Sequence, residues 1–496
     1  MTANTVPALI GGTFRESSSR QVDDIPDPAT GETIARLPHS TADELDQAVT
    51  AARAAFPGWA ETPSPDRAQV LFRLKALLED HVEELSLLVT RENGKTLPEA
   101  RGEVRRGIEV VDLACGAPTL LMGTSLDQIA DGIDEEVIRF PVGVVAGITP
   151  FNFPNMVPMW MIPLALACGN TFVLKPSQRT PLSAVRLGEL ITEAGFPDGV
   201  FNVVHGAKDS VDALLAHPGV DAVSFVGSAG VAASIYATAA AHGKRVQALG
   251  GAKNHMVVMD DADLEPTVTG LISSAFGNAG QRCLAGSVAV GVGSVGDVLV
   301  KEVVEQAERL RLGPGADPET DMGPVIREER RKELIGYVDD GLSAGARLVA
   351  DGREAGPDRG FFLGPTVFDD VTPDMRLWQD ELFGPVLSVV RADDLDAALR
   401  LVNASPYGNA ASIFTSSGAR AREFRRRVEA GMVGVNIGVP APMAFFPFVG
   451  WKRSFLGDLH ATGADGVRFY TKPKVVTTRW FLPPTLDHSL PEGRGH

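Results

Sequence analysis

From residue 142 onward, short β-branched segments alternate with stretches of helical periodicity, and this alternation limits the fold more than any other feature of the chain. The predicted buried strands are VGVVAGI, TFVL, FNVV, AVSFV and RVQAL. The predicted helices between them are residues 157–168, 181–194, 209–216 and 231–241. Because strands that alternate with helices form βαβ units, we predict an α/β fold whose parallel sheet binds ligands at the carboxyl ends of its strands.

The flanking regions predict further elements. Thr41 and Glu44 form a capping-box pattern at the start of one helix. The apolar periodicity of residues 66–89 predicts a second amphipathic helix over this range. Residues 256–436 form another α/β stretch, which we interpret as a separate domain. The segment KPKVVTTRWF predicts a last strand that can pair with another subunit, and residues 482–496 are Pro-rich and expected to be extended or disordered.

Length and charge exclude several classes of protein. A chain of 496 residues exceeds the size of one hydrophobic core, so we expect at least two domains. The net charge of −17 opposes binding to nucleic acid or anionic membranes. The arginine cluster within residues 420–427 lies on a helix-like stretch and is interpreted as a solvated face.

Three cysteines without CxxC spacing argue against disulfides and cysteine-rich metal sites, so no metal is expected. The longest apolar run, residues 157–168, is too short to span a membrane. The N-terminal residues resemble neither a secretory signal nor a transit peptide, and we therefore expect a cytoplasmic protein.

Cys283 is the first candidate for chemistry. It lies in GNAGQRCLAG, a glycine-rich turn between a predicted helix at residues 264–276 and the strand SVAVGV. Cys115 and Cys168 lie in more apolar surroundings, which are typical of structural cysteines. Arg282 beside Cys283 would favour the nucleophilic thiolate. From these residues alone, a reactive and a structural role for Cys283 both remain open.

Asn152 is a candidate partner for such a nucleophile. A thiolate that adds to an aldehyde creates an oxyanion, which preorganised donors must stabilise. Asn152 follows the VGVVAGI strand within ITPFNFPN, where aromatic and proline residues restrict the loop. Its amide could be a fixed donor, although an asparagine that caps a turn has the same signature.

Six motifs occur in one order along the chain: ITPFNFP, VLKPS, SFVGS, LGGAKN, GQRC and ELFGPV. In this order and spacing the chain closely resembles the aldehyde dehydrogenase superfamily, from IGG near residue 10 to FYTKPKVVTTRW near the C-terminus. The resemblance implies a Rossmann-like NAD domain, an α/β catalytic domain and a small β oligomerisation extension. The implied boundaries are 1–122 and 142–250 for the NAD-binding domain, 251–455 for the catalytic domain, 123–141 and 468–482 for the oligomerisation segment, and 483–496 for a C-terminal tail.

The resemblance also assigns site residues. It implies that Cys283 is the nucleophile and that Asn152, with the backbone N–H of Cys283, forms the oxyanion hole. Lys175 and Gln178 would contact the adenosine ribose of NAD, Ser228 its pyrophosphate and Glu381 the nicotinamide ribose. The other residues implied to line the cofactor cleft are Thr149, Phe151, Arg179 and Gly250.

The segment GVGSVG at residues 291–296 matches the dinucleotide fingerprint GxGxxG literally. A true fingerprint needs a second strand that ends in an acidic residue about 20 positions on. Here the following helix runs into RLRLGPGADPET without an apolar strand. We therefore predict that this segment does not bind the cofactor, and the resemblance places it in the catalytic domain.

One departure from the superfamily pattern concerns the acyl acceptor. Hydrolytic members carry a glutamate immediately before LGG, where this chain has Ala248. Loss of a general base should slow attack by water about 10²- to 10⁴-fold, so the thiol of coenzyme A becomes the expected acceptor. Replacement by another carboxylate, or loss of activity, remains open.

Further segments narrow the resemblance: AKNH, ACGAPTLLMG and GVPAPMAFFPFVGWKRSF. They look like the acylating methylmalonate-semialdehyde and malonate-semialdehyde dehydrogenase branch. The implied products are propionyl-CoA or acetyl-CoA and carbon dioxide. Arg106 and Arg282 match positions that this branch uses to bind the substrate carboxylate, and forked guanidinium donors suit that task.

The sequence also bears on the cofactor preference, the oligomeric state and the alternative functions of the chain. Gln178 replaces a glutamate that would repel the 2′-phosphate of NADP, which weakens the case for strict NAD preference. The family implies a homotetramer, or at least a dimer. The competing hypotheses are a hydrolytic aldehyde dehydrogenase that releases a free acid, and a non-enzymatic protein that retains the fold.

Overall fold

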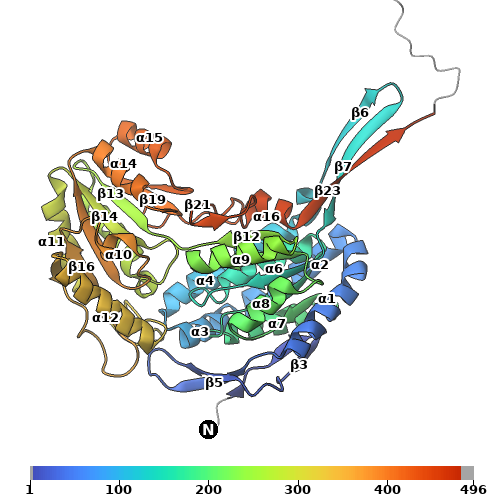
Figure 1. Cartoon of the computed structure of the whole chain (residues 1–496), viewed down its shortest axis with the longest axis horizontal. Helices are drawn as coiled ribbons and strands as arrows, with labels where there is room; N and C mark the ends of the chain where they lie inside the picture. The colour runs from blue at the N-terminus through green and yellow to red at the C-terminus, as the bar shows by residue number, and fades with distance from the viewer. Residues whose placement is uncertain (1–3, 482–496) are drawn as a thin grey trace, which may run out of the picture.

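The computed structural model describes residues 4–481, which form two lobes and a projecting β-arm (Figure 1). The first lobe contains an eight-stranded sheet of order β22-β12-β11-β8-β9-β10-β2-β3. Strands β8 to β12 are parallel, and β2, β3 and β22 extend the sheet antiparallel. The strands span Ala8–Ile10 (β2), Thr13–Arg15 (β3), Val144–Ile148 (β8), Thr171–Lys175 (β9), Phe201–Val203 (β10), Ala222–Val226 (β11), Arg245–Leu249 (β12) and Phe455–Leu456 (β22).

All five predicted strands and the four helices between them are present. The connecting helices are α6 (Met156–Ala167), α7 (Leu182–Glu193), α8 (Lys208–Ala216) and α9 (Ala229–Ala241). Each central strand of this sheet is buried along its whole length, as continuous apolar strands of a parallel sheet require. The prediction of a parallel α/β fold is therefore confirmed.

Four helices near the N-terminus pack around this sheet: α1 (Ala42–Glu61), α2 (Ser64–Asp80), α3 (Val82–Asn93) and α4 (Leu97–Cys115). The capping box of Thr41 and Glu44 is present at the start of α1. The prediction of one helix over residues 66–89 is wrong, because the chain breaks at His81 with φ −109° and ψ 15°. The His81 ring donates from Nδ1 to the Leu77 carbonyl at 2.8 Å, which caps the end of α2.

The second lobe contains a seven-stranded sheet of order β15-β16-β17-β14-β13-β19-β20. Its strands span Asn254–Val258 (β13), Gly286–Val292 (β14), Arg347–Ala350 (β15), Thr366–Asp369 (β16), Val386–Ala392 (β17), Ala410–Phe414 (β19) and Met432–Val435 (β20). Its helices are α10 (Leu264–Phe276), α11 (Val295–Ala307), α12 (Glu328–Ser343), α13 (Arg376–Gln379), α14 (Leu395–Ala404) and α15 (Gly418–Arg427). The sheet encloses its own apolar core, as expected for a separate domain.

On α15 only Phe424 is buried, so the arginine cluster is a solvated face as predicted. Arg420 pairs with Asp260, and Arg427 pairs with Asp396.

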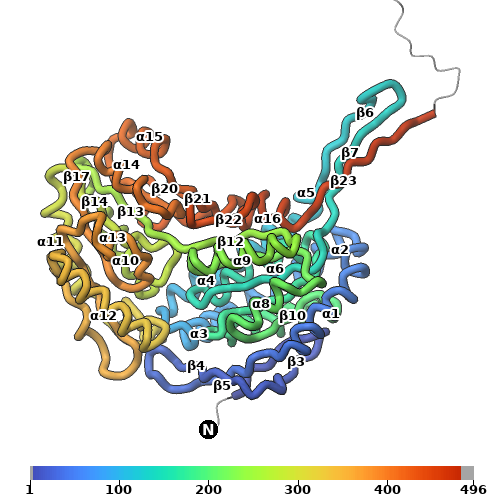
Figure 2. The backbone as a smooth tube through the Cα atoms, in the orientation of Figure 1, coloured from blue at the N-terminus to red at the C-terminus, as the bar shows by residue number. Residues whose placement is uncertain are grey.

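The β-arm consists of β6 (Thr124–Ala130), β7 (Ile133–Pro141) and β23 (Thr471–Arg479). Strand β23 leaves α16 (Gly463–Phe469) and pairs antiparallel with β7 over its whole length (Figure 2). Segments more than 300 residues apart thus form one sheet. A shorter sheet, β1 (Asn4–Thr5), β5 (Thr33–Pro38) and β4 (Val22–Pro26), lies near the N-terminus.

The predicted tail at 483–496 lies outside the described residues. Within residues 4–481, no helix is both long enough and apolar enough to cross a bilayer.

Candidate active site

Cys283 lies on a tight loop that follows α10. The loop begins with a short turn, Gly277–Gly280, in which Asn278 and Ala279 have φ of 51° and 50°. Non-glycine residues adopt this left-handed region only where surrounding contacts hold them there. Gly280 also has positive φ, and a Cβ on it would lie 2.1 Å from the Gly384 carbonyl oxygen. The glycine-rich sequence before Cys283 therefore permits a close approach between two backbones.

The loop is fixed at Cys283 itself. The carbonyl oxygen of Cys283 accepts hydrogen bonds from the side-chain amides of Asn254 and Asn409, each at 2.8 Å. Asn254 begins β13 and Asn409 immediately precedes β19, so the central strands of the second sheet hold the nucleophile. Cys115 and Cys168 are buried in the first lobe, as predicted for structural cysteines, whereas Cys283 is only half-buried.

The surroundings of Cys283 favour its protonated thiol. Burial and the nearby Glu381 carboxylate raise the pKa of the Cys283 thiol to about 12, while Arg282 lowers it only slightly. Arg282 favours the thiolate, as predicted, but burial outweighs its effect, and its guanidinium is also paired with Glu99 at 2.7 Å. Formation of the nucleophile requires removal of a proton as the reaction begins.

Asn152 is held beside the Cys283 loop. Its buried side-chain amide donates one hydrogen bond to the Gln281 carbonyl at 2.9 Å, two residues before the nucleophile. The backbone carbonyl of Asn152 accepts from Lys95 Nζ at 2.7 Å. Among the described residues, no acceptor other than the Gln281 carbonyl lies within hydrogen-bond distance of the Asn152 amide nitrogen, so its second N–H is free. The side chain is therefore a fixed donor, as a residue of an oxyanion hole must be.

Cys283 lines a cavity of about 510 Å³, referred to below as the Cys283 cavity. Arg106 and Arg282 lie in the same wall, so the structure brings the two predicted carboxylate ligands together with the nucleophile. The remaining wall is largely apolar and includes Phe153, Met156, Trp160, Leu284, Val439 and Phe448. A largely apolar cavity of this size with a few charged groups suits a small molecule.

Three carboxylates also line the Cys283 cavity, and each is already paired with a cation. Glu99 accepts from Arg282 at 2.7 Å, Glu103 from Lys95 at 2.5 Å and Glu109 from Arg106 at 3.0 Å. A carboxylate held by a cation is a weak general base, because the cation stabilises its charged form.

The residues predicted to bind NAD collect at one edge of the first sheet. Thr149 follows β8, Lys175 ends β9, Ser228 follows β11 and Gly250 follows β12. Phe151 lies beyond Thr149, and its ring meets Phe383 edge to face at 5.8 Å. Gln178 and Arg179 are half-buried on the loop after β9. This edge is where ligands of parallel sheets bind.

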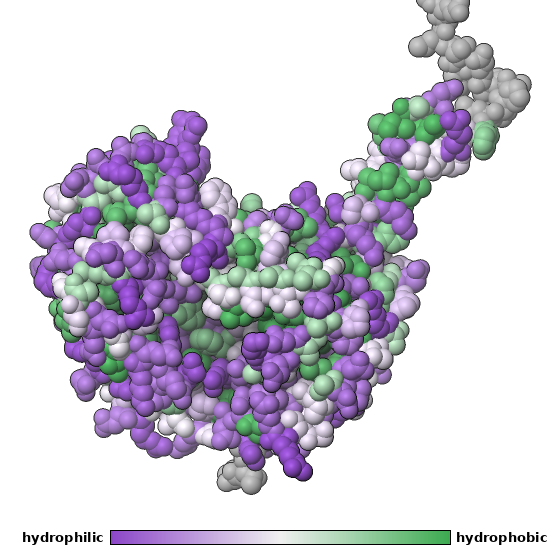
Figure 3. Space-filling model, viewed as in Figure 1, coloured by the Kyte–Doolittle hydropathy of each residue, from purple (hydrophilic) through white to green (hydrophobic). Residues whose placement is uncertain are grey.

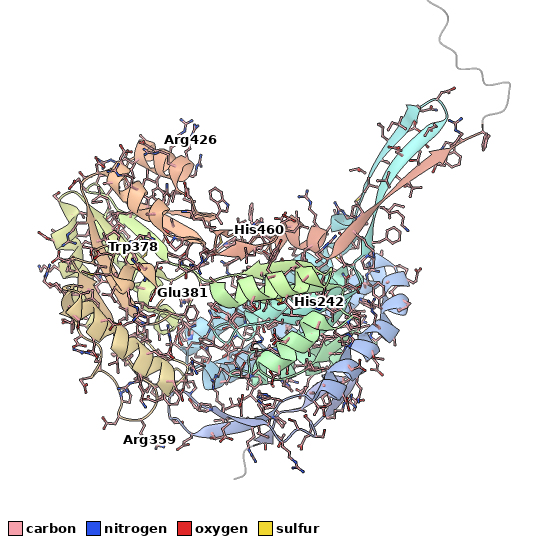
Figure 4. All side chains as sticks on the ribbon, in the orientation of Figure 1. His242, Arg359, Trp378, Glu381, Arg426 and His460 are labelled. Carbon is pink, nitrogen blue, oxygen red and sulfur yellow. The ribbon has the colours of Figure 1, made fainter. Side chains whose placement is uncertain are left out.

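Glu381 reaches this edge from the second lobe. Its carboxylate accepts from the Ala252 N–H at 2.8 Å, and Figure 4 shows it between the two lobes beside one end of α9. Burial raises the pKa of Glu381 to about 7, although the Ala252 hydrogen bond and the Lys253 ammonium oppose the shift. Lys253 donates to the carbonyls of Leu377 and Asp380 and so fixes the loop that carries Glu381.

These groups fit a dinucleotide. Ser228 is the N-cap of α9, its side chain makes no cap hydrogen bond, and the helix has 13 residues. The N–H groups of such a helix terminus suit a pyrophosphate. Lys175 is buried and donates to the Gly206 carbonyl rather than to an acid, which suits contact with ribose hydroxyls. A Cβ on Gly250 would lie 2.6 Å from the Arg453 carbonyl oxygen, so only glycine fits beside this edge.

The GVGSVG segment has a structural explanation. It joins the end of β14 to the start of α11 in the second sheet. A Cβ on Gly291 would lie 2.9 Å from the Gly296 Cα, so these glycines allow the strand and the helix to pack closely. The match to the fingerprint thus coincides with a packing requirement.

Sequence reasoning missed three polar residues of the site: Lys95, Glu99 and Glu103. Glu103 accepts from the backbone N–H groups of Asn155 and Met156 at the start of α6, and Lys95 donates to Asn152. One signal was present, because Glu99, Glu103 and Arg106 follow one another at spacings of four and three and therefore share a helix face.

Comparisons with known proteins agree with this arrangement. The family model described as aldehyde dehydrogenase family matches residues 14–476. Malonate-semialdehyde dehydrogenase 2 of Geobacillus kaustophilus is 57% identical over 478 residues, which cover 96% of this chain and 99% of that protein. The Halalkalibacterium halodurans malonate-semialdehyde dehydrogenase is 54% identical and covers 97% of this chain and 99% of its own length.

Two solved structures share the whole fold. The crystal structure of a methylmalonate-semialdehyde dehydrogenase from Oceanimonas doudoroffii has a TM-score of 0.95 and 49% identity, and covers 97% of this chain and 99% of its own. A structure from Sinorhizobium meliloti, described as a methylmalonate-semialdehyde dehydrogenase complexed with NAD, has a TM-score of 0.96 and 45% identity, with coverage of 98% and 99%. The chain therefore belongs to the aldehyde dehydrogenase family.

Proposed function

We propose that the protein oxidises malonate semialdehyde and methylmalonate semialdehyde with NAD and transfers the acyl group to coenzyme A. The products are acetyl-CoA or propionyl-CoA, carbon dioxide and NADH. One observation carries the proposal: the Cys283 cavity joins the nucleophile to Arg106 and Arg282, while its three carboxylates are all paired with cations. The names of the similar proteins support the same substrates.

The chemistry follows from the positions of Cys283 and Asn152. The Cys283 thiol releases its proton to water, its sulfur adds to the aldehyde carbon, and the oxygen that becomes negative accepts from the free Asn152 amide N–H and the Cys283 backbone N–H. NAD would be held by Thr149, Phe151, Lys175, Gln178, Arg179, Ser228, Gly250 and Glu381, and it would supply the acceptor for the hydride that this carbon loses. Cys283 then carries a thioester.

Arg106 and Arg282 would bind the substrate carboxylate. The two guanidinium groups approach the cavity from different elements, since Arg106 lies on α4 and Arg282 beside the nucleophile. Once the thioester has formed, its carbonyl accepts the electron pair that the departing carbon dioxide leaves behind. Decarboxylation therefore requires no further cofactor.

Whether water or coenzyme A accepts the acyl group depends on whether a side chain can activate water as a general base. Ala248 lies on β12 and is fully buried, so its position supplies no carboxylate to activate water. The thiol of coenzyme A is a better nucleophile toward a thioester and does not need the same general base. The hydrolytic alternative requires another base, and Glu381 is the carboxylate close enough to Cys283 to raise the pKa of its thiol.

Product analysis tests the proposal. Malonate semialdehyde and NAD are incubated with and without coenzyme A, and NADH, acetyl-CoA and free acid are measured. We expect coenzyme A to raise the rate of NADH formation about 10²-fold or more, because water attack lacks its base. Equal rates with accumulation of free acid would establish the hydrolytic alternative, and no NADH from any aldehyde would establish a non-enzymatic protein.

Three further assignments remain part of this proposal. The uncharged Gln178 leaves the preference between NAD and NADP to be measured by comparing both cofactors. The β-arm would pair subunits in a homotetramer or a dimer. A cytoplasmic location would supply both NAD and coenzyme A to the enzyme.

A further inference from the structure

The guanidinium of Arg282 is already paired with a carboxylate before any substrate binds. It donates to Glu99 Oε1 at 2.7 Å and to the Ser273 carbonyl at 3.3 Å, and both members of the pair line the Cys283 cavity. The guanidinium lies directly against Gly277, where a Cβ would approach its nitrogen atoms to 2.4 Å. The glycine at position 277 thus leaves room for the Arg282–Glu99 pair inside the cavity.

Glu99 also connects the pair to the nucleophile loop. The same Oε1 atom accepts from the Asn278 backbone N–H at 2.7 Å, at the first left-handed residue of the loop. The second oxygen, Oε2, accepts from the Thr96 N–H and hydroxyl at the start of α4. Thr96 therefore fixes one oxygen of the Glu99 carboxylate, and the other oxygen binds Arg282. A substrate carboxylate would bind the same guanidinium.

A substrate that loses its carboxylate as carbon dioxide places two opposing demands on the cation that binds it. The carboxylate must be bound, but its charge moves away in the transition state, into the enolate of the thioester. A cation that holds the carboxylate too strongly stabilises the ground state more than the transition state and slows the reaction. A resident carboxylate that shares the cation weakens this hold.

We propose that Glu99 is a positioning residue that shares Arg282 with the substrate carboxylate and so keeps the hold weak enough for decarboxylation. This inference rests on the proposed function. In the step concerned, the bond between the α-carbon and the carboxylate carbon of the Cys283 thioester breaks. Its electron pair enters the thioester enolate, carbon dioxide leaves, and the α-carbon takes a proton from water.

Glu99→Gln tests the inference, because glutamine keeps an oxygen for the Asn278 N–H but loses the charge that Arg282 needs. We expect KM for malonate semialdehyde to fall about fivefold, the upper end of what a partly exposed ion pair contributes. We expect kcat with this substrate to fall and malonyl-CoA to appear beside acetyl-CoA. Propanal, which has no carboxylate, should show no such fall in KM.

Two matched variants separate charge from structure. Thr96→Ala removes the hydroxyl contact to Glu99 but leaves its charge, and Glu83→Gln removes an equal charge from an exposed pair with Arg101. Both should retain the KM and the products of the unchanged enzyme.

Equal changes with propanal and malonate semialdehyde, or a Thr96→Ala enzyme that behaves like Glu99→Gln, would overturn the inference, since Glu99 would then merely support the loop. Failure of the proposed function looks different. In that case the unchanged enzyme itself would form no acyl-CoA from either aldehyde.

Discussion

At the scale of single residues, the thiol of Cys283 combines accessibility with a high pKa of about 12. Because the pKa is raised, the thiolate fraction at neutral pH is small and increases with pH. We predict that the rate of Cys283 alkylation by iodoacetamide in the free enzyme rises about tenfold per pH unit between pH 7 and 9. Peptide mass spectrometry, which distinguishes Cys283 from the buried Cys115 and Cys168, measures this rate.

Glu381 gives this prediction its control. Its charge raises the pKa of the Cys283 thiol, so Glu381→Gln should lower that pKa and accelerate alkylation at pH 8, where the carboxylate is ionised. A rate that is already independent of pH above 7 would show that the resting enzyme holds a thiolate.

Arg106 provides a second prediction at this scale. Arg106→Ala should lower kcat/KM for malonate semialdehyde about 10- to 100-fold, as expected for loss of a charged hydrogen-bonding partner. Propanal should be affected far less, because it has no carboxylate to bind. Arg101→Ala, which removes an exposed arginine from the same helix, serves as the control. Equal losses with both aldehydes would exclude Arg106 from carboxylate binding.

The residues of the site differ in how far the sequence could predict them. Cys283, Arg106 and Arg282 fall in recognisable motifs, and the structure brings them into one cavity. Glu99 and Lys95 could not be assigned, since their importance arises from partners 183 and 57 positions away in the sequence. The raised pKa of Cys283 could not be predicted from its sequence neighbours, because it results from burial and from Glu381, which is distant in the sequence.

At the scale of elements, the buried pair of Lys95 and Glu103 joins α4 to the start of α6. Both side chains are almost completely buried, and Glu103 also accepts from two backbone N–H groups of α6. Lys95→Met leaves the Glu103 charge without its partner and should lower the free energy of unfolding by about 3 kcal/mol. Urea unfolding measures the change.

The double variant Lys95→Met/Glu103→Leu supplies the comparison. It should be less destabilised than the sum of the two single variants, because no unpaired charge remains. Additive losses would contradict a direct interaction between the two side chains.

The elements themselves were largely predictable. Continuous apolar runs identified the five parallel strands of the first sheet, and the Thr41 capping box identified the start of α1. The boundary between α2 and α3 was missed, because the break at His81 depends on its ring contact with Leu77 and interrupts no apolar periodicity.

At the scale of the whole molecule, the β-arm projects from the first lobe (Figure 1), and Figure 3 shows apolar side chains among its hydrophilic ones. Its exposed apolar residues include Leu126, Ile129, Ile138, Val475 and Trp480. Such a surface on a projecting sheet is typical of a subunit interface. We predict that Val475→Asp gives a smaller assembly in size-exclusion chromatography with light scattering. An unchanged mass would mean that Val475 does not contribute to subunit contacts.

The central claim is that Cys283 carries an acyl group that water removes slowly and coenzyme A removes rapidly. Intact-protein mass spectrometry measures this directly after mixing the enzyme with NAD and propanal without coenzyme A. We predict a burst of about one NADH per active site and an adduct on Cys283 that persists until coenzyme A is added. Cys283→Ala should form no adduct. Continuous NADH formation at the full rate without coenzyme A, with no accumulated adduct, would contradict the claim.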